Sequence, residues 1–315
     1  MRIAILSRYQ NTISRGAESF VTELSSHLAK NNSVDVLSDS DTDSLRKILK
    51  GKYDIVMPIN GRLESLRASL GRVLGGYKLV IVGESGVGRD DIWNIAVSKP
   101  DAFIALTDYM ADWAKRWAWG TKVVKIPNGV DTNKFKPSGE KLKINLKKPI
   151  VISVGALTLN KHHERTISAL EKLPDVSLLI VGKGELEQDL DRLAKERLGD
   201  RFKIISAPFE DLPKIYRSAD LFVLPSWDRE AFGIVYIEAM ASGLPVVAPD
   251  DSPRREIVGP AGILVDVTNQ KKYALAIEEA LNRDWKGIPR QQAENFSWDK
   301  IAEKYERLFK GLILR

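Results

Sequence analysis

Short apolar runs alternate with segments of helical periodicity along almost the whole chain of 315 residues. Each run is three to five residues long, and helical patterns lie between several of them; in residues 18–30, for example, Val21, Leu24 and Leu28 recur at helical spacing. This alternation indicates parallel sheets covered by helices, an α/β fold. The expected strands are residues 2–6, 34–37, 55–59, 79–82, 102–106, 123–126, 150–154, 177–181, 202–205, 221–224, 245–248 and 263–265.

The chain is about twice as long as a typical single domain, so two domains are expected. A polar, lysine-rich stretch at residues 139–148 interrupts the alternation and is interpreted as the linker. The expected organisation is a first doubly wound domain at 1–138, a second at 149–297, and a closing segment at 298–315. In such sheets ligands bind at the carboxyl ends of the strands, so the default site is a central cleft that the two domains face.

Composition narrows the possible compartments and partners. The absence of cysteine excludes disulfides, thiolate metal sites and a cysteine nucleophile, and it fits a reducing compartment. The apolar run near the amino terminus is shorter than the roughly 7–15 residues of a signal peptide, and no stretch reaches the roughly 18 of a membrane span. A cytoplasmic protein is expected. The net charge of +6 favours anionic partners, but basic and acidic residues are interspersed, so no nucleic-acid partner is expected.

Residues 221–249 give the strongest chemical signal. A strand is followed by a polar loop, and a helix is expected to begin near Gly233. A helix start with a glycine offers free N–H groups to an anion such as a diphosphate. Glu230 before the helix and Glu238 within it could each accept hydrogen bonds from hydroxyls, one on a sugar and one on a ribose. The alternative is that Glu230 only stabilises the helix dipole and Glu238 is a solvated surface residue.

The segment from Glu230 to Glu238, followed by Ala-Met-Ala-Ser-Gly-Leu-Pro-Val-Val-Ala, resembles the E-x7-E signature of family 4 glycosyltransferases, which are retaining enzymes of the GT-B fold. Four further segments resemble family motifs in the same order, so the resemblance covers nearly the whole chain. They are Arg-Gly-Ala-Glu at 15–18, Ile-Pro-Asn-Gly-Val-Asp with the following Phe-Lys-Pro at 126–137, Val-Gly-Ala-Leu with the following lysine at 154–161, and Ile-Val-Gly-Lys-Gly-Glu at 180–185.

The resemblance implies two Rossmann-like domains, with the helix at 298–312 crossing back onto the first. It implies transfer of a hexose-type sugar from a nucleotide-diphosphate sugar to an acceptor hydroxyl with retention of configuration. The donor would be UDP-, GDP- or ADP-linked, and the acceptor a sugar, a lipid-linked molecule or another small molecule. No cofactor and no metal would be required.

The resemblance also assigns roles to residues. Glu230 would bind the donor sugar hydroxyls, Glu238 the ribose, and Lys161 would neutralise the diphosphate as the leaving group gains charge. Catalytic roles would fall to Glu230 and Lys161. A catalytic role for Glu84, as a polar residue on the acceptor side, is a separate hypothesis. The other expected donor-site residues are Arg15, Gly16, Gly184, Phe232, Gly233 and Ile234.

Two departures from the family pattern keep other functions open. Ala156 stands where an arginine is usual, and Glu84 follows the strand after which many relatives place a histidine. The alternatives are a nucleotide-sugar-binding GT-B protein that has lost catalysis, or a GT-B epimerase or phosphorylase. The chain's histidines are not assigned catalytic roles: His27 is expected at the surface, and His162 and His163 are expected to solvate the loop at Lys161.

Three further motifs resemble functional sequences but do not change the expected function. Residues 83–90 nearly spell a P-loop, but Arg89 and Asp90 replace the required lysine and hydroxyl residue. The aspartates of residues 39–43 superficially match a metal-binding DxD, and they are better interpreted as a helix cap. Trp113 and Trp117 with their basic neighbours suit a lipid headgroup layer. Packing of these tryptophans on the domain's own sheet is favoured, and peripheral contact with the inner membrane face is the alternative.

Overall fold

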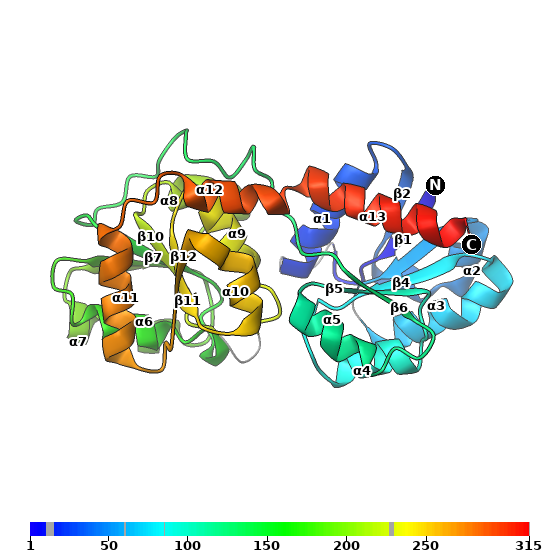
Figure 1. Cartoon of the computed structure of the whole chain (residues 1–315), viewed down its shortest axis with the longest axis horizontal. Helices are drawn as coiled ribbons and strands as arrows, with labels where there is room; N and C mark the ends of the chain where they lie inside the picture. The colour runs from blue at the N-terminus through cyan, green and yellow to red at the C-terminus, as the bar shows by residue number, and fades with distance from the viewer. Residues whose placement is uncertain (11–15, 60, 85, 227–229, 315) are drawn as a thin grey trace. The chain divides into compact units, whose positions relative to one another are not determined.

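The computed structural model describes residues 1–10, 16–59, 61–84, 86–226 and 230–314. The chain forms two compact units (Figure 1): Met1–Gly129 together with Trp298–Arg315, and Val130–Ser297. Each unit contains one six-stranded sheet in which all neighbouring strands are parallel. The expected α/β architecture is confirmed, because the buried apolar runs form the strands and the periodic segments form the helices.

The first unit has the strand order β2-β1-β3-β4-β5-β6. Strand β2 is added on one side of β1 and strands β3 to β6 on the other, so the order of the strands reverses between β1 and β3. Its strands are β1 (Arg2–Leu6), β2 (Ser33–Leu37), β3 (Ile55–Pro58), β4 (Lys78–Val82), β5 (Ala102–Ala105) and β6 (Lys122–Lys125). Its α-helices are α1 (Gly16–Leu28), α2 (Leu45–Lys50), α3 (Arg62–Gly75), α4 (Arg89–Ala96), α5 (Asp108–Lys115) and α13 (Trp298–Ile313). Each strand lies within about a residue of its expected position, because an apolar run ends where the chain leaves the core.

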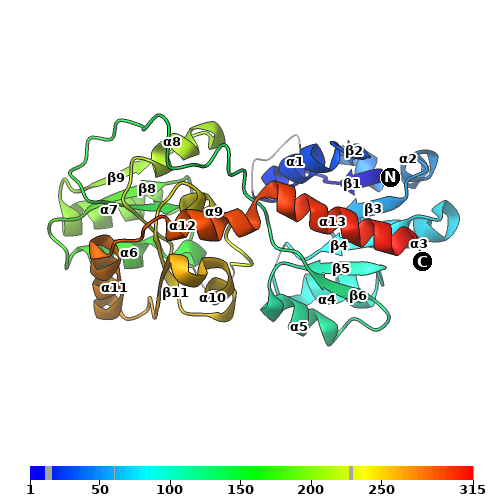
Figure 2. The ribbon, with the colours of Figure 1, turned by 45° about the horizontal axis from the view of Figure 1, so that its top comes forward.

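The closing helix α13 lies beside α1 in the first unit (Figures 1 and 2). Trp298 packs on Phe20 with ring centroids 5.7 Å apart, and Tyr305 packs on the same ring at 6.5 Å. Gly129 must be a glycine here, because a Cβ would lie 2.4 Å from the Trp298 ring. The expectation that His27 is a surface residue is wrong. Its ring is half-buried and stacks on Trp298, since α13 covers this face of α1.

The second unit has the strand order β12-β11-β10-β7-β8-β9, which reverses between β7 and β10. Its strands are β7 (Ile150–Val154), β8 (Ser177–Val181), β9 (Phe202–Ile205), β10 (Leu221–Val223), β11 (Val246–Pro249) and β12 (Gly262–Val265). Its α-helices are α6 (His163–Leu170), α7 (Glu187–Leu198), α8 (Leu212–Tyr216), α9 (Ile234–Ala241), α10 (Ser252–Val258), α11 (Gln270–Asn282) and α12 (Ile288–Ala293). This is the strand order of a dinucleotide-binding Rossmann sheet.

Residues 139–148, the expected linker, are held on the surface of the second unit. The Lys214 ammonium lies 2.9 Å from the Glu140 carboxylate, and the Arg217 guanidinium donates a 2.8 Å hydrogen bond to the Glu140 carbonyl. Ser218 donates a 2.7 Å hydrogen bond to the Leu142 carbonyl. Polar contacts with the end of α8, rather than apolar burial, therefore fix this segment.

Two local expectations are corrected. The aspartates of Asp39–Asp43 form a short 3-10 helix, and the cap of α2 is the next residue, Ser44, whose side chain accepts a hydrogen bond from the Lys47 N–H at 3.3 Å. Trp113 on α5 is half-buried, but Trp117 is 39% exposed, so Trp117 is not buried against its own unit as the favoured interpretation expected. Helix α5 ends at Lys115, so Trp117 lies beyond the helix that carries Trp113.

Candidate functional site: the β7/β10 edge

The strand order of the second unit reverses between β7 and β10, so the loops that follow these strands leave the sheet in opposite directions. Open parallel sheets bind ligands outside the carboxyl ends of strands at such a reversal. The loop after β7 leads to Lys161, and the loop after β10 leads to Glu230 and the start of α9. Ser226 joins the two loops by donating a 2.8 Å hydrogen bond to the Asn160 carbonyl.

Lys161 and Glu230 form an ion pair beside the carboxyl ends of β7 and β10, a place that is called the β7/β10 edge here. The Lys161 ammonium donates a hydrogen bond to Glu230 Oε2. The side chains are only 19% and 13% exposed, so solvent screens their attraction less than it would at an open surface. The structure thus brings together two of the three residues expected to be catalytic, 69 positions apart in the chain.

The backbone of Glu230 is fixed by a residue that sequence analysis did not identify. Arg254 on α10 is 1% exposed and donates a 2.8 Å hydrogen bond to the Glu230 carbonyl. Its charge is balanced by Asp251, which accepts from Arg254 Nε at 2.9 Å and also caps α10. A buried arginine needs such a partner. The Asp-Ser-Pro-Arg cap could have been recognised in the sequence, but its contact with Glu230 could not.

Gly233 closes the loop and precedes α9, which begins at Ile234, one residue after the expected start. Its φ of +82° lies in the left-handed region, and a Cβ would lie 2.6 Å from the Tyr236 ring. Phe232 is 2% exposed and packs edge-on against Phe296. Its side chain therefore belongs to the core, which leaves only its backbone for a ligand.

Glu238 lies inside the second unit and is 4% exposed. The Tyr216 hydroxyl donates a 2.9 Å hydrogen bond to Glu238 Oε2. Burial raises the pKa of Glu238 to about 7, although the hydrogen bond from Tyr216 acts in the opposite direction. The alternative that Glu238 is a solvated surface residue is wrong, because α9 is buried along most of its length.

Gly184 lies in the loop after β8, which runs against the loop after β7. The Leu157 N–H donates to the Lys183 carbonyl at 2.9 Å, and the Leu186 N–H donates to the Leu157 carbonyl at 3.0 Å. A Cβ on Gly184 would lie 2.3 Å from the Leu157 carbonyl oxygen, so only glycine permits this approach. Gly184 is thereby placed beside the loop that carries Lys161.

His163 contacts the loop that leads to Lys161 and is 1% exposed. The expectation that it solvates this loop is therefore wrong. Its Nδ1 lies 3.0 Å from the Ser153 hydroxyl, and its Nε2 lies 3.3 Å from the Ala156 carbonyl. Burial lowers the pKa of His163 to about 4, so the ring is neutral near pH 7. Its role is to position the loop.

The third expected catalytic residue, Glu84, lies in the first unit two residues after the end of β4. Glu84 Oε2 accepts a 3.3 Å hydrogen bond from the Asn128 amide, and burial raises the pKa of Glu84 to about 7. Among the described residues, the buried atoms Glu84 Oε1, Asn128 Oδ1 and Tyr305 Oη have no hydrogen-bond partner. Buried polar atoms are rarely left in this state, so this cluster has capacity to bind a polar group.

The remaining donor-side expectations concern the start of the first unit's helix α1. Gly16 is the first residue of α1, and Arg15 lies outside the described residues. Within the described part of the chain, no group of three or more His, Cys, Asp or Glu side chains could hold a metal ion.

Two doubly wound units, each with a six-stranded parallel sheet, define a glycosyltransferase fold of the GT-B type. The chain belongs to the family of glycosyl transferases group 1, whose pattern matches residues 135–302. This match includes Lys161, Gly184 and the whole segment from Glu230 to Glu238.

The chain is similar to several known proteins. It is 33% identical over 214 residues to an uncharacterized glycosyltransferase of Methanocaldococcus jannaschii, covering 60% of this chain and 54% of that protein. It is 31% identical over 215 residues to the phosphatidyl-myo-inositol mannosyltransferase of Mycolicibacterium smegmatis, covering 64% and 55%. The matches thus span about half the length of these curated relatives. The crystal structure of Anabaena HepE with UDP and glucose has the same fold, with a TM-score of 0.77 at 20% identity over 99% of this chain and 100% of that chain.

Proposed function

We propose that this protein transfers a hexose-type sugar from a nucleotide-diphosphate sugar to an acceptor hydroxyl with retention of anomeric configuration. The observation that carries the proposal is the Lys161–Glu230 pair beside the start of α9, at the strand reversal of the second unit. A cation, a carboxylate and the N–H groups at the start of a helix in one place match the diphosphate and the hydroxyls of such a donor. Family membership and the UDP and glucose bound in HepE support the same donor class.

Each residue has a defined task in the reaction. The bond between the sugar's anomeric carbon and the phosphate oxygen breaks, and a bond from that carbon to the acceptor oxygen forms on the same face. Lys161 and the N–H groups at the start of α9 stabilise the negative charge that develops on the diphosphate. Glu230 accepts hydrogen bonds from sugar hydroxyls, and the acceptor's proton passes to the departing phosphate oxygen. No cofactor or metal takes part in this scheme.

Other residues complete the donor site. Glu238 binds the ribose, Gly184 borders the nucleotide, and the backbone from Phe232 to Ile234 faces the donor. We also assign Gly16, the first residue of helix α1, and Arg15 to the donor phosphate. The donor is a UDP-, GDP- or ADP-linked sugar.

The acceptor is a hydroxyl compound held on the first unit, where Glu84, Asn128 and Tyr305 leave polar atoms unpaired within the described residues. Sugars, lipid-linked molecules and small molecules all carry such hydroxyls. A lipid-linked acceptor is supported by the mannosyltransferase of Mycolicibacterium smegmatis, whose name specifies a phosphatidylinositol acceptor. With such an acceptor, the protein works as a cytoplasmic enzyme in peripheral contact with the inner face of the membrane. None of the helices in the described part of the chain has the length and apolar character of a membrane span.

The proposal is tested by measuring nucleotide release from UDP-glucose, GDP-mannose and ADP-glucose with and without a panel of acceptors. Lys161→Ala is expected to lower turnover with the preferred donor by about 10²–10³, the usual effect of removing one charge-stabilising donor. Lys195→Ala, an exposed lysine on α7, serves as the control and should leave turnover unchanged. Donor binding without any sugar transfer would favour the alternative of a nucleotide-sugar-binding protein.

A further inference from the structure

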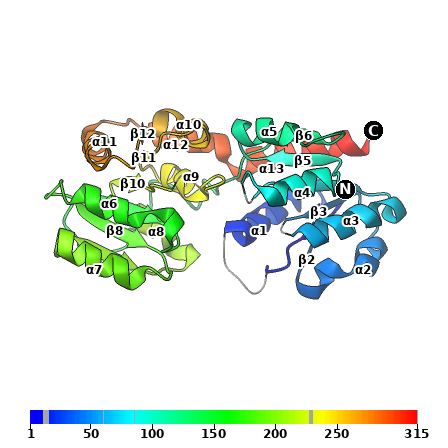
Figure 3. The same ribbon diagram turned by 90° about the horizontal axis from the view of Figure 1, so that it is seen from below.

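A second buried carboxylate lies next to Glu84 in the first unit. Asp91 is in the first turn of helix α4, which lies between α3 and α5 (Figure 3), and it is 3% exposed. A Cβ on Gly83 would lie 3.3 Å from Asp91 Oδ2, so the Asp91 carboxylate lies against the backbone immediately before Glu84. The two acids are therefore neighbours beyond the carboxyl end of β4.

The charges of these two acids are not balanced by the protein. Within the described residues, no ion pair joins Glu84 or Asp91 to a cation. Burial, followed by the negative charges of Asp90 and Glu84, raises the pKa of Asp91 to about 7. Burial also raises the pKa of Glu84 to about 7. Buried carboxylates are normally paired with a cation, so this place has a negative charge that a cationic ligand can neutralise.

Two asparagines bring further hydrogen-bond acceptors to the same place. The Asn128 amide donates a 3.3 Å hydrogen bond to Glu84 Oε2, and a hydrogen bond from Asn94 opposes the rise in the pKa of Asp91. Asn128 and Asn94 are only 2% and 9% exposed. Among the described residues, four buried oxygens have no hydrogen-bond partner here: Glu84 Oε1, Asp91 Oδ2, Asn94 Oδ1 and Asn128 Oδ1. Native proteins rarely leave such atoms unpaired, so a ligand that donates hydrogen bonds is indicated.

Tyr305 adds one hydroxyl from helix α13, which lies on the opposite face of the sheet from α4 (Figure 1). Its side chain is fully buried, and its Oη has no partner among the described residues. Burial, and then the negative charge of Glu84, raises the pKa of Tyr305 well above its ordinary value, which places the hydroxyl near this carboxylate. The four unpaired oxygens and this hydroxyl are named the Glu84 cluster below. The cluster accepts more hydrogen bonds than it can donate.

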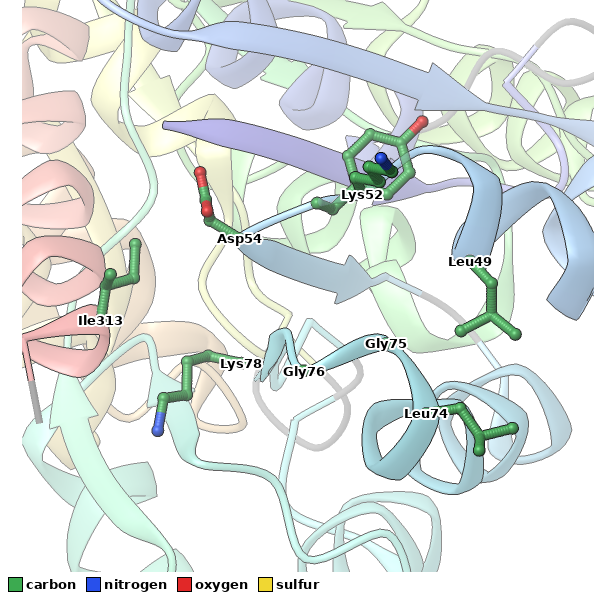
Figure 4. A pocket seen from close by; sticks show the side chains of 9 residues that line it. Leu49, Lys52, Asp54, Leu74, Gly75, Gly76, Lys78 and Ile313 are labelled. Atoms are coloured by element: carbon green, nitrogen blue, oxygen red, sulfur yellow. The ribbon is translucent and has the colours of Figure 1, made fainter.

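A pocket at the other end of the same sheet has the opposite charge. Its volume is about 510 Å³, and it opens where β3 and β4 begin. Figure 4 shows Lys52 and Lys78 among the side chains that line it. Asp54 also lines it, but Asp54 Oδ2 accepts a 2.6 Å hydrogen bond from the Arg2 N–H. A cation is therefore better neutralised in the Glu84 cluster than in this pocket.

We propose that the Glu84 cluster binds an ammonium group of the acceptor, so that the acceptor is an amino sugar or another amino alcohol. An ammonium group has only donors, whereas a neutral hydroxyl compound brings as many acceptors as donors. Its hydrogen bonds to carboxylates are charge-assisted and about twice as strong as neutral ones. Within the described residues, no group of three acidic or histidine side chains could hold a metal ion instead. The inference rests on the proposed function, because it gives a chemical class to the acceptor held on the first unit.

The test is calorimetric titration of glucosamine, galactosamine and mannosamine, and of their N-acetyl derivatives, into the full chain without a nucleotide. Wild type is expected to bind at least one amino sugar about tenfold or more tightly than its N-acetyl derivative, because acetylation removes the charge. Asp91→Asn and Glu84→Gln are each expected to lose this preference. Asp112→Asn on α5 is the matched control and should keep it, since the Asp112 side chain is 72% exposed.

Equal affinity of wild type for every amino sugar and its N-acetyl derivative would overturn the inference. An unchanged preference in the folded variants would also overturn it. A third contrary result is thermal stabilisation by potassium chloride, but not by tetramethylammonium chloride, that Asp91→Asn loses while no amino sugar binds. An inorganic cation would then be the occupant. Thermal unfolding shows which variants are folded, and either of the two is sufficient for the test.

The donor site is tested separately by titrating UDP-glucose, GDP-mannose and ADP-glucose into the same proteins. Asp91→Asn and Glu84→Gln should bind the preferred donor as wild type does, because Lys161 and Glu230 lie in the second unit. A wild type that binds a donor but does not prefer amino sugars contradicts this inference alone. A wild type that prefers amino sugars but binds no donor contradicts the proposed function and supports the ammonium site.

Discussion

The Tyr216 hydroxyl donates a 2.9 Å hydrogen bond to the Glu238 carboxylate in the interior of the second unit, where both side chains are buried. Glu238 is the second glutamate of the E-x7-E segment, and the resemblance assigns it to the donor ribose. In the structure it is bonded to the protein itself. For Glu238 to bind a ribose, its carboxylate must either share its acceptor capacity with Tyr216 or exchange one hydroxyl for another.

Tyr216→Phe is expected to destabilise the second unit by about 1–3 kcal/mol, because it leaves a buried carboxylate oxygen without its donor. Urea unfolding followed by fluorescence measures the change. Tyr273→Phe provides the comparison: its hydroxyl is also buried but lies 3.2 Å from the neutral Thr166 hydroxyl, so its loss should be smaller. Equal losses of unfolding free energy in the two variants would show that the hydrogen bond from Tyr216 to the Glu238 carboxylate is no stronger than one between two neutral hydroxyls.

The raised pKa of Glu238 makes stability depend on pH in a known direction. The pKa is about 7 in the folded protein and near 4.5 when unfolded, so between these values the folded state binds more protons. Stability therefore falls as pH rises from about 4.5 to 7. Glu238→Gln removes this contribution, and its unfolding midpoint should fall less than that of wild type over the same range. A parallel pH dependence in the two proteins would contradict the assignment.

His163 contributes with the opposite sign. Its pKa is about 4 in the folded protein and near 6.5 when unfolded, so the unfolded state binds the extra proton between these values. Stability from this residue is full above pH 6.5 and is lost as pH falls toward 4. His163→Gln should unfold with a weaker acid dependence than wild type in this window, which thermal melts at half-unit pH steps would detect.

Gly233→Ala is expected to weaken both the fold and donor binding. An alanine at φ +82° is strained by about 1–2 kcal/mol, and its Cβ would also meet the Tyr236 ring at 2.6 Å. Gly287→Ala isolates the backbone strain, because Gly287 has a φ of +75° with nothing within 4 Å of the added Cβ. Calorimetric titration with the preferred donor should show weaker binding for Gly233→Ala and none of this effect for Gly287→Ala.

Glu84→Gln tests the acceptor side. With a pKa of about 7, Glu84 becomes a better hydrogen-bond acceptor as pH rises through neutrality, so transfer to the acceptor should rise with it. The glutamine variant should lose that rise while donor hydrolysis stays unchanged. A transfer profile identical to that of wild type would remove Glu84 from the proposed site.

Much of the fold could be predicted because its signals are local. The buried strands are apolar runs bounded by turns, and Gly233, Gly243 and Pro245 mark the limits of α9 in the sequence itself. The contact between Lys161 and Glu230 follows less directly. It depends on β7 and β10 being neighbours, which the resemblance to the family implied and local patterns could not.

Other features depend on contacts between distant residues, and the sequence alone did not reveal them. Arg254 contacts the Glu230 carbonyl from 24 positions away, and Tyr216 contacts Glu238 from 22. The cap sequence around Arg254 marks the start of α10 but not the contact with Glu230, and nothing near Tyr216 distinguishes it from an ordinary core residue. The exposure of Leu70, Val73 and Leu74 was likewise hidden, because apolar residues at helical spacing are also the pattern of a helix that packs this face on its own sheet.

The central claim, that the donor diphosphate is bound at the edge formed by Lys161, Glu230 and the start of α9, is tested most directly by calorimetric titration of UDP-glucose, GDP-mannose and ADP-glucose into wild type, Lys161→Ala and Lys195→Ala. We expect one of these donors to bind wild type and Lys195→Ala alike, and to bind Lys161→Ala at least about tenfold more weakly, since a charge-assisted contact is lost. Equal affinity of all three proteins for the preferred donor would place the diphosphate elsewhere and contradict the account.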